Sequence, residues 1–166
     1  MKYQLFDEDG IIAIVNAEKY NGFIGEDWEL NELTELFVQQ MNEQNLIIWK
    51  ASEYGNNWNI EIRVTASHNK AFRTFEKTIE VTSGELYFID YTSLTMIAQF
   101  ENESVKGQCP DIQKINIENG SYNVTVRQMS DPDNFEEEDN KVHFEIILKK
   151  STKHDSVNQI FWWETN

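Results

Sequence analysis

The residues that most often carry catalysis are few and scattered in this sequence. Its one thiol is Cys109, and no histidine stands near it in the chain to act as a base. The three histidines, His68, His143 and His154, lack the spacing to each other or to Cys109 that a zinc site needs. His143 takes the polar register of an alternating segment, so we expect it at the surface. We therefore predict no catalytic residue, no metal site and no cofactor.

Ligand-binding motifs are absent or incomplete. The sequence contains no glycine-rich phosphate loop and no Gly-x-Ser-x-Gly elbow. Asp131 and Asp133 open an acidic stretch, residues 130–140, in the manner of a calcium loop. Glu136 and Val142 then stand where an EF-hand needs its glycine and its bidentate glutamate, which excludes that motif. Calcium held between loops and an acidic loop without a ligand both remain open.

Charge and length restrict the possible partners. The chain has 29 acidic and 14 basic residues, for a net charge of −15, which argues against binding nucleic acid or an anionic membrane. No apolar run reaches the roughly 18 residues of a membrane span, and the N-terminus lacks a signal-peptide pattern. With 166 residues and 40% hydrophobic content, we expect a single domain over residues 1–166, located in the cytoplasm.

One amphipathic helix is predicted near the N-terminus, over residues 27–44. Its apolar stripe at helical spacing consists of Leu30, Leu33, Phe37 and Met41. The opposite face gathers four glutamates around one leucine: Glu29, Glu32, Glu35, Glu43 and Leu36. No Lys or Arg occurs between Lys19 and Lys50, so this face has a single sign of charge.

A face of one sign is costly for an isolated helix, because like charges three or four residues apart repel each other. One explanation is a solvated surface whose charge only keeps the protein in solution. The other is a docking surface for a basic protein, with Leu36 as an apolar anchor. The carboxylates of the later acidic loop would assist in docking: Asp131, Asp133, Glu136, Glu137, Glu138 and Asp139.

Short segments of alternating polarity occupy most of the remaining chain. About nine of them have the spacing of an antiparallel β-sandwich, which is the predicted fold class. The centre is placed at residues 78–100, read as a three-stranded meander whose last strand runs through residues 94–100. Asp9-Gly10 and Asn119-Gly120 are expected to close hairpins. Residues 160–163 form either a terminal strand or an apolar patch that fixes the C-terminus.

Part of this pattern is similar to known proteins. From residue 58 the chain reads Trp-x-Ile-x-Ile-x-Val, and later Gly84-Glu-Leu-Tyr and Asn119-Gly-Ser-Tyr before a Val-x-Val strand. Residues 58–148 thereby resemble small bacterial β-sandwich proteins of unknown function. More distantly, they resemble the competence-associated inhibitor of a DNA-entry nuclease. This resemblance implies a non-catalytic inhibitor or immunity protein for a toxin or nuclease with a basic cleft.

A second function remains open. Five tryptophans are present, and aromatic rings at a surface can stack on sugars. Trp49 and Trp58 lie in apolar strand patterns and are predicted to be core residues. Trp28, Trp162 and Trp163 are then the candidates for binding a small molecule or a carbohydrate.

Overall fold

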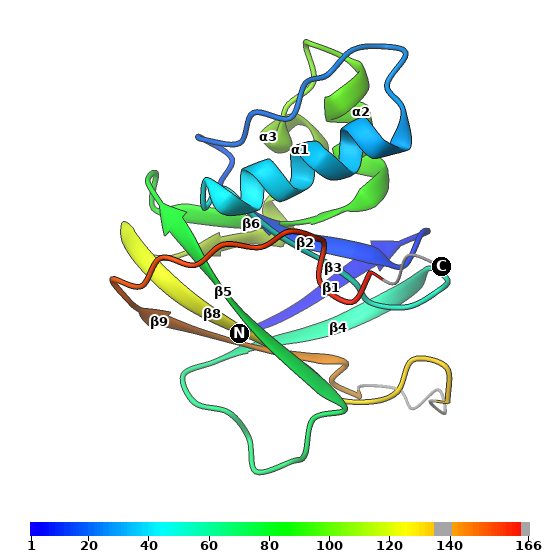
Figure 1. The fold of residues 1–166 in the computed structure, drawn as a ribbon. Helices are drawn as coiled ribbons and strands as arrows, with labels where there is room; N and C mark the ends of the chain where they lie inside the picture. The colour runs from blue at the N-terminus through cyan, green and yellow to red at the C-terminus, as the bar shows by residue number, and fades with distance from the viewer. Residues whose placement is uncertain (135–140, 164–166) are drawn as a thin grey trace.

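Two β-sheets packed face to face form the body of the protein, and helices cover one of them (Figure 1). The computed structural model describes residues 1–134 and 141–163. Within these residues, the five-stranded sheet has the order β1-β4-β9-β8-β5 and the four-stranded sheet the order β3-β2-β6-β7. The strands are β1 (Lys2–Asp7), β2 (Ile11–Val15), β3 (Leu46–Lys50), β4 (Asn56–Arg63), β5 (Arg73–Val81), β6 (Glu85–Asp90), β7 (Lys114–Asn116), β8 (Gly120–Gln128) and β9 (Phe144–Lys150). The helical elements are α1 (Leu30–Asn42), α2 (Tyr91–Gln99), α3 (Val105–Gln108) and the 3-10 turn η1 (Asp111–Gln113).

The four-stranded sheet is buried on both faces. One face meets the five-stranded sheet in a core that contains Trp49, Trp58 and Phe144, so both tryptophans are core residues as predicted. The other face meets the helices in a second core that includes Phe37 and Ile97. Burial on two sides explains why β2 and β6 are almost wholly apolar instead of alternating.

The predicted strand over residues 94–100 is wrong, because this segment belongs to helix α2. The side chain of Asp90 caps the helix by accepting a hydrogen bond from the backbone N–H of Ser93, at 3.1 Å. Leu94, Ile97 and Ala98 are the buried residues, at the i, i+3, i+4 spacing of a helix face. The apolar residues of this segment are compatible with the period of a strand and with that of a helix. Packing of the segment against the sheet selects the helix.

The predicted meander and hairpins are also wrong, since the turns connect different sheets. β1 pairs with β4, whereas β2, which follows Gly10, pairs with β3 and β6. The turns at Gly84 and Gly120 likewise carry the chain from one sheet to the other. Gly10 and Gly120 do have positive φ, 74° and 149°. The breaks between strands at these glycines were predicted correctly, and the pairing of the flanking strands was not.

The sheets are mostly but not entirely antiparallel. β4 and β9 run parallel, with Ile60 opposite Phe144 and Ile62 opposite Ile146. Every other strand pair is antiparallel in the part of the chain that the structure describes. The fold is therefore a mixed β-sandwich. Among the same residues, no helix is long and apolar enough to cross a bilayer.

α1 has narrower bounds than the helix predicted over residues 27–44. Leu33, Phe37 and Met41 are buried against the four-stranded sheet, as the apolar stripe required. Leu30 is 52% exposed, so its assignment to that stripe was wrong. It is the first residue of the helix, and the buried residues of the helix begin at Leu33.

Residues 160–163 form no strand and instead end a segment that crosses β5 beneath α1 (Figure 1). We call residues 151–163 the C-terminal segment. Phe161 makes one isolated bridge to Trp49, and its carbonyl accepts a hydrogen bond from the backbone N–H of Lys50, at 3.0 Å. The segment thereby covers β3 and β5, the outermost strands of the two sheets on that side.

Candidate functional site

The acidic face of α1 comprises the residues predicted from sequence: Glu29, Glu32, Glu35, Leu36 and Glu43. All four glutamates are exposed, and Leu36 is half-buried. Within the described part of the chain, none of the four carboxylates forms an ion pair. The face therefore presents negative charge that no described basic residue neutralises.

Two of these glutamates also have local structural contacts. The Glu32 carboxylate accepts a hydrogen bond from the backbone N–H of Glu29, at 2.8 Å, and so helps to cap the start of α1. The Glu43 carboxylate accepts from the side-chain amides of Gln39 and Gln40, at 3.0 and 3.3 Å. Sequence reasoning missed both roles. The sequence does contain a signal for the cap, a glutamate three residues after the capping position. The signal was missed because the capping position holds Glu29, and glutamate is not a common capping residue.

α1 is held at both its buried face and its last turn. The Asn42 side chain donates to the carbonyl of Val157 at 2.9 Å and accepts from the N–H of Val157 at 2.8 Å. This pair joins the helix to the C-terminal segment. The acidic face therefore lies on an element whose position is fixed by the core and by a second contact.

The C-terminal segment is itself held by a buried charge. The Lys77 side chain is fully buried, and its ammonium donates to Asp155 at 2.6 Å. The hydroxyl of Thr78 donates to the same carboxylate oxygen at 2.8 Å. Burial acts to raise the pKa of Asp155, but the hydrogen bonds from Lys77 and Thr78 hold it below its usual value.

A groove of about 380 Å³ runs between α1 and the C-terminal segment. It is lined by Thr34, Glu35, Val38, Asn158, Gln159, Ile160 and Trp163. Glu35 thus belongs both to the acidic face of α1 and to the groove. Of the tryptophans considered for ligand binding, Trp163 lines this groove and Trp28 is half-buried near the helices.

Trp162 borders a separate hollow of about 240 Å³, together with Phe72 and Asp131. The guanidinium of Arg73 lies 4.0 Å from the centre of the Trp162 ring, and Phe75 meets the ring edge-on. One face of Trp162 is therefore already occupied, which leaves less of the ring for stacking on a sugar.

The acidic loop does not join the acidic face of α1 within the described residues. Asp131 and Asp133 belong to the segment that follows β8, and this segment lies on the side of the molecule away from α1 (Figure 1). The Asp131 carboxylate accepts from the N–H of Asp133 at 3.0 Å and from the Asn134 side chain at 3.1 Å, so it closes a local turn. The remaining predicted loop residues, Glu136, Glu137, Glu138 and Asp139, lie outside the described residues.

The thiol and the histidines are not brought together. Cys109 is buried behind the four-stranded sheet, and burial raises the pKa of its thiol to about 12. His143 is buried, contrary to prediction, because its ring packs edge-on against Trp58 and its Nδ1 accepts from the N–H of Asn59 at 2.9 Å. Burial, and then the charge of Lys141, lower its pKa. Among the described residues no cluster of three potential metal ligands occurs.

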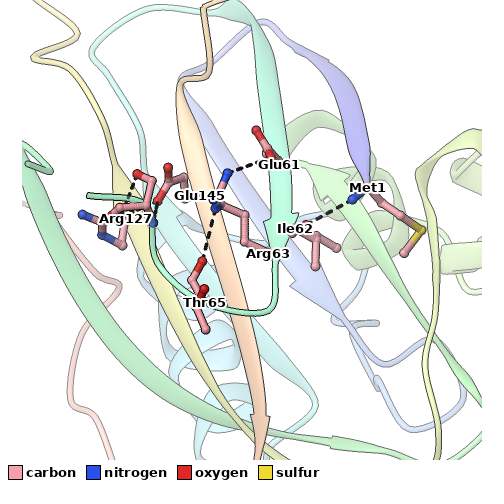
Figure 2. A network of polar contacts seen from close by, with 8 residues as sticks. Met1, Glu61, Ile62, Arg63, Thr65, Arg127 and Glu145 are labelled. Carbon is pink, nitrogen blue, oxygen red and sulfur yellow. Dashed lines mark hydrogen bonds and ion pairs between the residues drawn. The ribbon is translucent and has the colours of Figure 1, made fainter. Parts of the chain in front are cut away.

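On the outer face of the five-stranded sheet, in contrast to α1, carboxylates form ion pairs. Glu145 is only 4% exposed, and Arg127 forms an ion pair with it while also binding backbone oxygens of the loop after β4 (Figure 2). On the neighbouring strand, Arg63 pairs with Glu61 at 3.0 Å. Burial tends to raise the pKa of Glu145, but hydrogen bonds from Ser67 and the pairing with Arg127 leave it lowered. These charges fasten a loop onto the sheet.

Comparison with known proteins extends the fold description. No protein-family model and no curated protein matches this chain. Among solved structures, the chain is similar to one described as "Crocagin biosynthetic gene J", with a TM-score of 0.58 and 12% identity over 90% of this chain and 95% of that chain. It is also similar to ComJ from Bacillus subtilis, described as an inhibitor of the DNA degrading activity of NucA. That match has a TM-score of 0.44 and 10% identity, and it covers 89% of this chain and 92% of that chain.

The distant resemblance to the competence-associated nuclease inhibitor is thereby confirmed as a resemblance. At such identities the similarity to the first structure describes the fold alone. What the protein binds has to be argued from its own surfaces.

Proposed function

We propose that this protein is a non-catalytic protein-binding module that docks on a basic protein through the acidic face of α1. The observation that carries the proposal is the set of four exposed carboxylates on one helix and its two capping residues, none of them ion-paired within the described residues. The helix is anchored by a buried apolar stripe and by Asn42. A fixed array of like charges is complementary to a basic surface.

The chemistry of such a face favours fast and selective association. Exposed charges act mainly on the association rate and on partner choice, and their contribution to affinity is smaller. Leu36, half-buried among the glutamates, supplies apolar contact near the centre of the face. The sequence resemblance implies the class of partner, a toxin or nuclease with a basic cleft.

The non-catalytic part of the proposal is supported by the separation of the reactive groups. With a pKa of about 12, the Cys109 thiol is protonated at neutral pH and is a poor nucleophile. His143 lies on the five-stranded sheet, whereas Cys109 lies behind the other sheet, so they cannot act as a pair. A screen against ester, peptide, phosphoester and glycoside substrates should find no turnover, and measurable turnover would contradict this part.

The test of docking is a matched pair of charge reversals. Glu35→Lys/Glu43→Lys changes the face and leaves Glu32 free to cap the helix. Glu8→Lys/Asp111→Lys alters two exposed acids outside α1 by the same net charge. In a pull-down from the native host, followed by mass spectrometry, the α1 variant should lose a basic partner that the wild type and the control retain. Capture should weaken steeply with salt. If both variants are folded and retain the partner equally, the acidic face of α1 is only a solvated surface.

A second candidate function is the binding of a small carbohydrate. The observation that favours it is Trp163, half-buried in a groove of suitable size. Titration with mono- and disaccharides, followed by tryptophan fluorescence, tests it. A saturable change that Trp163→Ala abolishes would support this function over protein docking.

A further inference from the structure

The groove between α1 and the C-terminal segment combines apolar, polar and acidic side chains. Val38, Ile160 and Trp163 provide apolar and aromatic surface. Glu35, on the same groove, is exposed and has no ion-pair partner among the described residues. A groove that offers apolar and aromatic surface beside one carboxylate suits a long side chain with an apolar stem and a cationic end.

The walls of the groove are held in place before any ligand arrives. Asn42 binds both the N–H and the carbonyl of Val157, at the start of the wall formed by the C-terminal segment. Asp155, two residues earlier, is fixed by buried Lys77. Phe161 stacks on Phe75 with ring centres 3.9 Å apart. A preformed site loses little conformational entropy on binding.

One described cation, Lys50, lies beside Trp163 and is not paired with Glu35. The ammonium of Lys50 lies 5.6 Å from the centre of the Trp163 ring, so a second cation has to use the part of the ring that Lys50 leaves open. Lys50 is itself neutralised by Glu53, at 2.9 Å. The groove therefore keeps the negative character that Glu35 gives it.

The adjacent residue shows which cation this surface fits. The guanidinium of Arg73 lies 4.0 Å from the centre of the Trp162 ring, and its edges donate to Gln128 at 2.6 Å and to the carbonyl of Lys50 at 3.0 Å. A planar guanidinium stacks on an indole and donates in its own plane at the same time, which an ammonium cannot do.

We propose that the groove binds an arginine side chain of the basic partner. Its stem packs against Val38, and its guanidinium stacks on Trp163 and pairs with Glu35. This inference rests on the proposed docking function and deepens it, because it assigns the partner residue that anchors beside the acidic face. The acidic face then guides association while the groove selects arginine.

The test uses two probes that differ in charge and hardly in shape, N-acetyl-arginine amide and N-acetyl-citrulline amide. The full chain, labelled with ¹⁵N, is titrated with each probe, and the indole N–H signal of Trp163 reports on the groove. The buried Trp49 and Trp58 provide reference signals. Arginine amide should shift the Trp163 signal saturably, and citrulline amide should bind at least about threefold more weakly.

Matched variants locate the charge. Glu35→Gln should reduce arginine binding to the level of citrulline. Glu8→Gln, an exposed acid outside both the acidic face and the groove lining, should leave it unchanged. Equal binding of both probes, an unmoved Trp163 signal, or equal effects of the two variants would overturn the inference. So would a shift produced by N-acetylglucosamine alone, which would favour a carbohydrate site. The same spectra show whether each variant is folded.

The two proposals can fail separately. If Glu35→Lys/Glu43→Lys loses the partner while arginine amide does not bind in the groove, docking stands and the arginine site falls. If both α1 reversal and control variants keep the partner, docking falls whatever the probes show.

Discussion

Carboxylates on the outer face of the five-stranded sheet and carboxylates on α1 differ in burial and in ion pairing. On the sheet, Glu145 is buried and paired with Arg127, and Glu61 is paired with Arg63. On α1 the glutamates are exposed and unpaired within the described residues. The first arrangement holds a loop to the protein, and its removal should reduce stability. The second contributes little to stability, which leaves its charge available to a partner.

The largest effect is expected where a charge is buried. Arg127→Met removes the partner of Glu145 and keeps most of the apolar stem, leaving a buried carboxylate without its cation. The free energy of unfolding should fall by about 2–3 kcal/mol, measured by urea denaturation. The control is Lys150→Met, whose pair with Glu118 is exposed on both sides and should matter little. Equal losses in the two variants would remove the distinction between buried and exposed pairs.

Acid should act on the paired carboxylates. The folded-state pKa values of Glu145 and Asp155 lie below the ordinary values of these side chains, 4.5 and 3.8. Their stabilisation is therefore complete above those pH values and is lost as the pH falls through the folded-state pKa. Stability measured from pH 6 to pH 2 should decline at the acid end, and Arg127→Met should flatten the part due to Glu145. An unchanged acid profile in that variant would contradict the assignment.

A smaller loss is expected at the start of α1. Glu32→Ala removes the acceptor that binds the backbone N–H of Glu29 and should cost about 0.5–1 kcal/mol in thermal unfolding. Glu32→Gln can still accept that hydrogen bond and should recover most of the loss. If Glu32→Gln does not recover the lost stability, the charge of Glu32 contributes more to stability than its capping hydrogen bond does.

The smallest effect, of opposite sign, is expected at Glu35. Glu35→Ala removes a like-charged neighbour of Glu32, three residues away, and introduces a better helix former. Stability should stay the same or rise by about 0.2–0.5 kcal/mol in the same assay. A clear loss of stability would show that Glu35 has a structural role, and would weaken the comparison on which the docking proposal rests.

The periodicity of the sequence predicted the helices and strands better than it predicted which strands pair with each other. The alternation in β4 and β8 and the apolar stripe of α1 reflect burial on one side, which local sequence records directly. Gly10 and Gly120 signalled turns with positive φ, but a turn residue does not encode which sheet the next strand joins. In residues 94–98 the same apolar positions satisfy two periods, and only packing against the four-stranded sheet selects the helix.

The candidate site was partly visible in the sequence. The one-signed face of α1 follows from residue spacing alone. The groove could not be predicted, since it joins α1 to residues more than a hundred positions later in the chain. The prediction that His143 lies at the surface was wrong for a related reason, because its burial depends on Trp58 and Asn59 from another strand.

The central claim, that the acidic face of α1 docks on a basic protein, is tested most directly by association kinetics with the captured partner. The association rate constant should fall roughly tenfold in Glu35→Lys/Glu43→Lys and stay near wild type in Glu8→Lys/Asp111→Lys, with the gap narrowing at high salt. Equal rate constants for the two variants at low salt, with both folded, would contradict the claim.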